Sequence, residues 1–248
     1  MTTIEWKDPA ESLWTCNSSL ISQNLNCTFI QGLLLDCQSH LSSSTSSSSS
    51  PTLPLNKYLE YLSQDTYYLQ VYARAYAYAL ARCEEFSVIE KIKVLLDGVF
   101  EELKYHQLYL GKYGLQVAKK ISKETGNYVD FLISVAKEQP VQALLAAVIP
   151  CTRLYLYLGT ELKSQLNMES LNSFNNLNLE GKEKVDKIEL YFNWIEKYSS
   201  DGLRDVCHLL ESLFNDLVKD ADEELVELCK QNYKKALQLE LEFFEQVN

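Results

Sequence analysis

Glycine and proline are scarce in this sequence, which has 8 and 5 of them among 248 residues. Because both residues punctuate turns, their scarcity disfavours a sandwich or barrel of short strands and favours long helices. Basic residues are also few, with 23 Lys and Arg against 34 Asp and Glu and a formal net charge of −11. Such a surface repels phosphate backbones and anionic lipid, so neither nucleic acid nor a membrane is an expected partner.

Recognisable cysteine patterns are missing as well. The seven cysteines include no CxxC or CxxH pair, so the sequence predicts neither a disulfide framework nor a metal site. No apolar run reaches the roughly 20 residues of a membrane span, and charges and a proline occupy the start, where a signal peptide needs an apolar run. We therefore expect a cytoplasmic protein with reduced thiols.

Apolar residues at helical spacing predict an all-α multi-helix bundle, formed as a single domain over residues 1–248. The first thirty or so residues indicate a helix or broken helix ending near Gly32. Two polar stretches predict loops within the domain, a disordered Ser-rich one at about 41–51 and an Asn-rich one at about 164–181. The other predicted helices are 55–81, 88–117, 128–137, 141–162, 182–197, 202–219 and 221–244.

Three reactive side chains lie on apolar stripes, where each requires an explanation. Asp65 shares a stripe with tyrosines and leucines in the helix that begins near Leu55, and Glu240 lies between apolar residues of the last helix. Cys151 continues a stripe of leucine and valine directly after Pro150. The proline predicts either a kink or a new helix start, and in a first helical turn the dipole would lower the pKa of the Cys151 thiol.

Each of these residues also has a structural explanation. A buried free cysteine is most often inert packing, a buried carboxylate can be paired in the core, and Asp65 could cap a break within Ser63–Thr66. Together, however, a thiol, two carboxylates and several phenols from different helices could converge on a pocket inside the bundle. Such a pocket would suit nucleophilic attack with acid–base assistance, on a substrate that the spacings do not specify.

Four segments resemble successive signatures of the TenA/thiaminase II family. They are Leu53–Leu69 (LPLNKYLEYLSQDTYYL), Ile149–Gly159 (IPCTRLYLYLG), Tyr191–Asp201 (YFNWIEKYSSD) and Leu239–Phe244 (LELEFF). They occur in family order over most of the chain and are most similar to the cysteine-bearing TenA domain of plant two-domain thiamin phosphate phosphatases. The resemblance implies a haem-oxygenase-like helical bundle, usually a homotetramer.

The resemblance also implies an activity and a set of site residues. Family members hydrolyse aminomethyl- or thiazolium-bearing aminopyrimidines to the hydroxymethylpyrimidine, in salvage of degraded thiamin. Cys151 matches the nucleophile and Glu240 the glutamate that donates and accepts protons. Asp65 matches a ligand of the pyrimidine. The remaining matches to substrate-binding residues are Tyr68, Tyr128, Tyr155, Tyr198 and Phe243.

Other features have weaker functional claims. Glu102 and His106 are spaced i, i+4 on one helix, but further metal ligands are missing, so we interpret them as structural. Neither haem nor another cofactor is expected. The alternative function is a non-catalytic pyrimidine- or thiamin-binding protein, or a helical partner, motivated by departures from the family pattern such as Gly202 in place of an aromatic residue.

Overall fold

The computed structural model describes residues 8–41, 52–166 and 182–247, and these residues form ten α-helices and no strand. The all-α prediction is therefore confirmed. Most residues of the two predicted loops, 42–51 and 167–181, lie outside the described ranges. Of the few loop residues that the structure does describe, most belong to the ends of helices. The helices are α1 (Pro9–Cys16), α2 (Ser18–Leu25), α3 (Thr28–Leu41), α4 (Leu55–Arg82), α5 (Phe86–Lys112), α6 (Lys123–Glu138), α7 (Val141–Gln165), α9 (Lys182–Tyr198), α10 (Asp201–Val218) and α11 (Glu223–Glu245).

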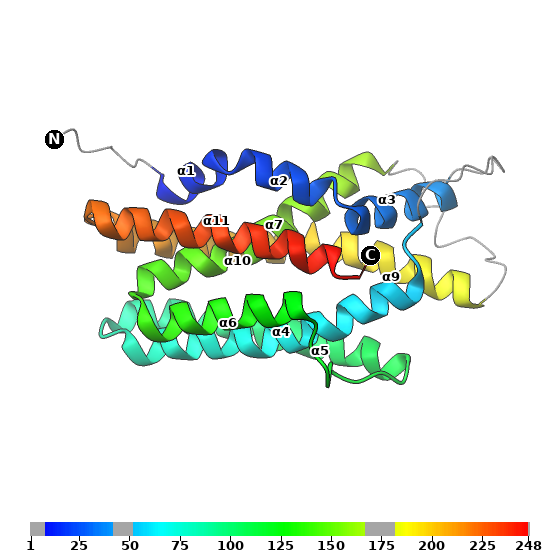
Figure 1. Ribbon diagram of the computed structural model, residues 1–248, viewed down its shortest axis with the longest axis horizontal. Coiled ribbons are helices and arrows are strands. Elements are labelled where there is room, and N and C mark those ends of the chain that lie inside the picture. Colours follow the sequence, from blue (N-terminus) through cyan, green and yellow to red (C-terminus); the bar gives the residue numbers. More distant parts are fainter. Residues whose placement is uncertain (1–7, 42–51, 167–181, 248) are drawn as a thin grey trace.

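Helix α7 is the central element of an elongated bundle. Its neighbours include α4, α6, α9, α10 and α11, and in Figure 1 it crosses the bundle diagonally behind α11, starting beside the layer of α4, α5 and α6. Every residue from Ala143 to Pro150 is buried. α7 has the length and hydropathy of a membrane span, but 61% of the relevant window is buried inside the bundle. Its apolar composition therefore matches that of a core helix.

The N-terminal region differs from its prediction. Instead of ending near Gly32, the chain forms three helices, and α3 continues through Gly32 to Leu41. A Cβ atom at Gly32 would lie 3.1 Å from the Cβ of Leu53. The glycine thus marks a close approach between two segments and not a helix end.

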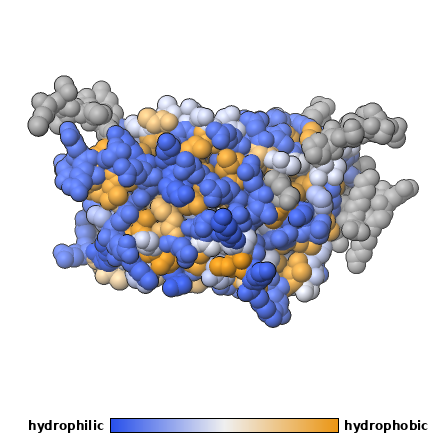
Figure 2. Space-filling model, viewed as in Figure 1, coloured by the Kyte–Doolittle hydropathy of each residue, from blue (hydrophilic) through white to orange (hydrophobic). Residues whose placement is uncertain are grey.

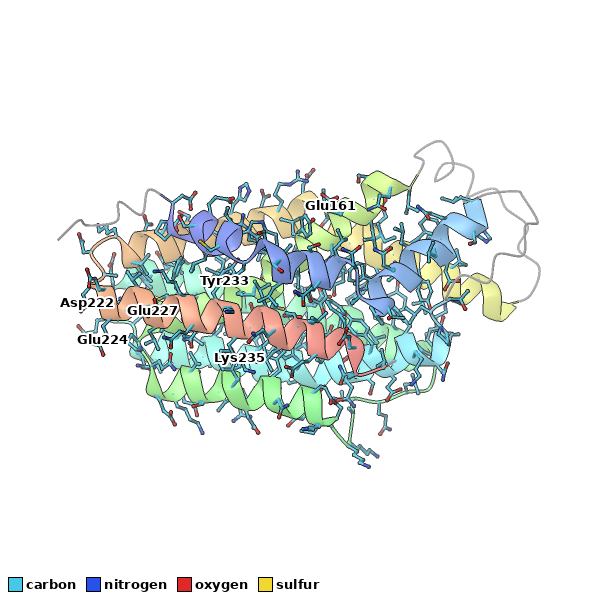
Figure 3. All side chains as sticks on the ribbon, turned by 45° about the horizontal axis from the view of Figure 1, so that its top comes forward. Glu161, Asp222, Glu224, Glu227, Tyr233 and Lys235 are labelled. Carbon is cyan, nitrogen blue, oxygen red and sulfur yellow. The ribbon has the colours of Figure 1, made fainter. Side chains whose placement is uncertain are left out.

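Side-chain caps set several helix starts. α6 begins at Lys123, five residues before its predicted start, because the Ser122 side chain accepts a hydrogen bond from the Thr125 N–H. Asp222 caps α11 in the same way by accepting from Leu225. Figure 3 shows Asp222 near the acidic beginning of α11, with Tyr233 further along the helix that carries Glu240.

The outer surface agrees with the acidic, polar composition. The face shown in Figure 2 is mostly hydrophilic, with small separated hydrophobic patches. In contrast, tyrosines and phenylalanines from α3, α4, α7, α9 and α11 meet in the buried core. The reactive side chains singled out by the sequence lie at one edge of this aromatic core.

Candidate active site

A cavity of about 320 Å³ lies between α4, α5, α7, the end of α9 and the start of α10. Four of the predicted site residues line it: Asp65, Cys151, Tyr155 and Tyr198. Its inner part is polar and aromatic, whereas Leu95, Val99 and Leu203 give the part between α5 and α10 an apolar wall. A cavity of this size and lining is typical of small-molecule sites.

Cys151 lies in the middle of α7, because the helix passes through Pro150 without ending. The hypothesis of a new helix start is therefore wrong, and no helix N-terminus stabilises the thiolate. The side chain is half-buried and reaches the cavity. Burial raises the pKa of the Cys151 thiol well above its ordinary value, and the nearby Glu240 and Asp65 carboxyls raise it further. The thiol is thus protonated at rest and needs a base to become a nucleophile.

Glu240 can exchange a proton with this thiol. Its side chain is 1% exposed, and Tyr128 donates a hydrogen bond of 2.7 Å to its Oε1 atom. Burial raises the pKa of Glu240 to about 8, although hydrogen bonds with Tyr128 and Cys151 act in the opposite direction. A carboxyl group with a pKa near neutrality suits general acid–base catalysis.

Asp65 approaches the cavity from α4. It is 5% exposed and lies well inside a continuous helix, which rules out the alternative of a cap or break at Ser63–Thr66. Burial raises the pKa of Asp65 to about 6, and the charge of His106 lowers it. Asp65 is therefore mostly ionised at pH 7 and can accept hydrogen bonds from a ligand.

Glu102 and His106, which the sequence indicated as structural, are in fact linked to the cavity wall. His106 Nε2 lies 3.1 Å from Glu102 Oε1 and 3.7 Å from Asp65 Oδ2. Glu102 lines the cavity, accepts a hydrogen bond of 2.9 Å from Tyr198 and forms a 2.7 Å ion pair with Lys197. Within the described residues, no group of three or more His, Cys, Asp or Glu side chains could hold a metal ion.

The other four predicted site residues lie in a layer behind Cys151 and do not line the cavity: Tyr68, Tyr128, Glu240 and Phe243. The Tyr68 ring is 4.6 Å from that of Tyr128 and 5.9 Å from that of Phe243, centroid to centroid. The buried Tyr68 hydroxyl lies next to the Cys151 thiol and the Tyr128 hydroxyl, and hydrogen bonding from Tyr68 lowers the pKa of that thiol against the larger effect of burial.

Several wall residues were missed by sequence reasoning. Tyr72 and Thr152 line the cavity and lie 3.4 Å apart, from hydroxyl to hydroxyl. Tyr61 lies behind the wall and donates a hydrogen bond of 3.1 Å to Tyr155. Tyr61 and Tyr72 belong to the same apolar stripe as Asp65, so helical spacing could have found them, whereas Thr152 has no distinguishing signal beyond its place next to Cys151.

Gly159 fixes the position of Tyr198. A Cβ atom at Gly159 would lie 2.4 Å from the carbonyl carbon of Tyr198 and 2.8 Å from the nitrogen of Ser199. Only glycine therefore allows α7 to pack this closely against the end of α9. That contact places the Tyr198 ring 4.9 Å from the ring of Tyr155 in the cavity wall.

The fold and this site define a class: a helical bundle whose interior holds a thiol, two carboxyls and a phenol-rich cavity. The profile of the TENA/THI-4/PQQC family matches residues 46–247, and the chain belongs to this family. The chain is 27% identical over 212 residues to the bifunctional TH2 protein of Arabidopsis thaliana, covering 77% of this chain and 32% of that protein. It thus spans about a third of the length of that relative.

Another relative has a more similar length. The aminopyrimidine aminohydrolase of Halalkalibacterium halodurans is 24% identical over 68% of this chain and 70% of its own. Among solved structures, a TenA homologue from Pyrococcus furiosus aligns with a TM-score of 0.75 at 17% identity, over 97% of this chain and 100% of its own. This structural likeness confirms the helical bundle of the fold prediction.

Proposed function

We propose that this protein is a thiaminase II-type hydrolase that releases 4-amino-5-hydroxymethyl-2-methylpyrimidine from aminomethylpyrimidine, with thiamin as a second substrate to be tested. The observation that carries the proposal is the thiol of Cys151 on the cavity wall, with the carboxyl group of Glu240 against it. The names of the family and of the aminohydrolase relative support the same chemistry.

The proposed reaction consumes water and replaces the amine on the methylene carbon by a hydroxyl group. The Glu240 carboxylate takes the proton of Cys151 as the sulfur adds to the pyrimidine ring. The protonated Glu240 then returns a proton to the departing amine. The oxygen of a water molecule adds to the methylene carbon, Glu240 takes the proton that this water releases, and the departing sulfur receives that proton from Glu240, which restores the thiol.

Binding is assigned to the remaining residues. The Asp65 carboxylate would accept a hydrogen bond from the amino group of the pyrimidine, and Tyr155 and Tyr198 would contact the ring from the cavity wall. Tyr68 and Phe243 support this layer from behind, while Tyr128 holds the carboxyl of Glu240. The cavity of about 320 Å³ admits a single substituted ring, and its apolar part between α5 and α10 would receive the thiazole ring when thiamin is the substrate.

We further propose thiamin salvage in the cytoplasm as the role, and a homo-oligomer, with a tetramer expected, as the working form. Exposed large hydrophobic side chains gather along one face of α5, at 50% to 74% exposure: Phe86, Val94, Phe100 and Leu108. A second copy of the chain would bury this face. Light scattering on Phe100→Glu combined with Leu108→Glu should then give a lower mass than the wild type, and an unchanged mass would contradict this interface.

The experiment that tests the function follows hydroxymethylpyrimidine release from aminomethylpyrimidine, and separately from thiamin. Wild-type protein should turn over the aminomethyl compound, and Cys151→Ser should lose at least about a thousandfold in rate because serine is a far weaker nucleophile here. Cys16→Ser is the matched control, because this exposed thiol lies away from the cavity. Equal rates for Cys151→Ser and wild type would refute the nucleophile.

The same wild-type and Cys151→Ser proteins distinguish the hydrolase from the alternative, a non-catalytic binding protein. It predicts calorimetric binding of hydroxymethylpyrimidine without release of product from either substrate. Wild-type turnover that disappears with Cys151→Ser excludes it.

A further inference from the structure

Two glycines line the cavity at positions where the backbone does not require them. Gly98 lies in the middle of α5, and Gly202 lies in the first turn of α10. Neither has a positive φ, so any residue could adopt the backbone conformation at both positions. A glycine inside a helix destabilises that helix relative to alanine. The presence of both glycines in the wall of one cavity therefore needs another explanation.

Close packing does not supply this explanation. Apart from the chain neighbours and the backbone of its own helix, no atom lies within 4 Å of a Cβ added at Gly98. At Gly202 the nearest such atom is the hydroxyl oxygen of Ser200, at 4.0 Å. Gly32 and Gly159 differ, because a Cβ at these positions would lie 3.1 Å and 2.4 Å from another segment of the chain. Side chains at Gly98 and Gly202 would instead enter open space.

The helical period places this open space on the cavity side of both helices. On α5, Leu95 and Glu102 line the cavity and stand three residues before and four residues after Gly98. On α10, Val206 lines the cavity four residues after Gly202. Residues three or four apart share one face of a helix. A side chain at either glycine would therefore project toward the cavity and narrow it.

The two glycines lie where the cavity reaches the surface. Gly202 and Glu101 are the exposed members of the cavity lining, and Gly98 is half-buried. The cavity thus opens between α5 and α10, at the end that has the apolar wall, whereas Cys151 lines its polar and aromatic part. In the proposed function, the pyrimidine lies against Cys151 and the thiazole ring of thiamin lies at this open end.

We propose that Gly98 and Gly202 are specificity-determining residues, whose missing side chains keep the α5–α10 end of the cavity open to aminopyrimidines that carry a second ring on the methylene carbon. This inference rests on the proposed function for the pyrimidine and its place beside Cys151. It adds that the chain accepts a leaving group of the size of the thiazolium ring. An amine leaving group does not need this space, so a larger residue at either glycine should affect the two substrates differently.

Release of hydroxymethylpyrimidine from thiamin and from aminomethylpyrimidine, followed in parallel, tests this inference. Gly98→Leu should lower kcat/KM for thiamin about 10- to 100-fold relative to kcat/KM for aminomethylpyrimidine, because the leucine would occupy the space of the thiazolium ring. Gly202→Leu should change the ratio in the same direction from α10, which does not carry the exposed apolar residues of α5. Losses that are equal for the two substrates would refute the inference.

Gly111→Leu is the matched control for the effect of leucine on α5. Gly111 lies on the same helix, and a Cβ added there also meets nothing within 4 Å, but this glycine does not line the cavity. Its substitution should leave the ratio of the two kcat/KM values within about twofold of that of the wild type. A change in the ratio as large as that with Gly98→Leu would show that the space at the cavity mouth is not the cause.

Calorimetry adds a readout that does not depend on turnover. In a Cys151→Ser background, Gly98→Leu should raise Kd for thiamin at least about tenfold and Kd for hydroxymethylpyrimidine less than about twofold, because only thiamin carries the second ring. An equal rise for both ligands would contradict the inference. If Gly98→Leu does not fold, Gly202→Leu serves for the same measurement.

Failure of this inference is distinguishable from failure of the proposed function. Wild-type protein that releases hydroxymethylpyrimidine from aminomethylpyrimidine but neither binds nor cleaves thiamin overturns the inference alone. Wild-type protein that releases product from neither substrate overturns the proposed function.

Discussion

The two buried carboxyl groups at the cavity have contrasting surroundings. Asp65 lies near His106, and its pKa is raised only to about 6. Glu240 has a phenol and a thiol as its hydrogen-bonding partners, and its pKa is raised to about 8. Similar burial thus gives one carboxyl that is ionised at pH 7 and one that exchanges its proton near neutrality. This contrast supports the proposed roles, in which Asp65 binds the ligand and Glu240 transfers protons.

Glu240→Gln should give the largest effect, because an amide can neither take the proton of Cys151 nor return it. We expect turnover of aminomethylpyrimidine to fall by about 10² to 10⁴, with the affinity for hydroxymethylpyrimidine changed by less than about threefold. Steady-state kinetics and calorimetry measure the two quantities. Glu242→Gln, on the same helix but only partly buried, is the control and should match wild type.

Asp65→Asn should show the opposite pattern. Replacing the ionised acceptor by an amide should raise Kd for hydroxymethylpyrimidine about 10- to 100-fold, because the buried hydrogen bond to the amino group is lost. If Asp65→Asn reduced only the rate and Glu240→Gln reduced only the affinity, the assignment of the two carboxyls would be reversed.

The same contrast predicts a pH dependence of stability. Between its unfolded pKa near 4.5 and its folded pKa of about 8, Glu240 holds a proton in the folded state that it loses on unfolding. The folded state therefore binds more protons, and the free energy of unfolding should fall as the pH rises through this range. Glu240→Gln should remove most of the fall between pH 6 and 8, as measured by urea denaturation. A slope identical to that of wild type would show that Glu240 is ionised at pH 6.

Tyr128→Phe should give the smallest effect. Its hydroxyl lowers the pKa of Glu240, so its loss should move the pH of half-maximal kcat/KM from near 8 to a value up to about one unit higher. Tyr198→Phe is the matched control, since its hydroxyl binds Glu102 and not Glu240. A shift with Tyr198→Phe equal to that with Tyr128→Phe would contradict a specific role for the Tyr128 hydrogen bond.

Helix positions could largely be predicted from the chain alone, because apolar spacing is a local property. The predicted helix over 141–162 corresponds to α7, and the one over 55–81 to α4. The errors arose where a residue that often ends a helix is present for a tertiary reason. Gly32 was predicted to end a helix, but it allows close packing against Leu53. Pro150 is likewise tolerated inside α7. The burial of α7 in the core stabilises the helix despite the hydrogen bond that the proline removes.

The sequence by itself determined that Asp65, Cys151 and Glu240 face the interior, because side-chain direction follows from the period of each helix. Only the tertiary structure decided which of these residues reach the cavity, that His106 stands beside Asp65, and that Glu240 has a phenol and a thiol as its partners. Ionisation depends on charges and burial contributed by other helices, and no local spacing specifies them.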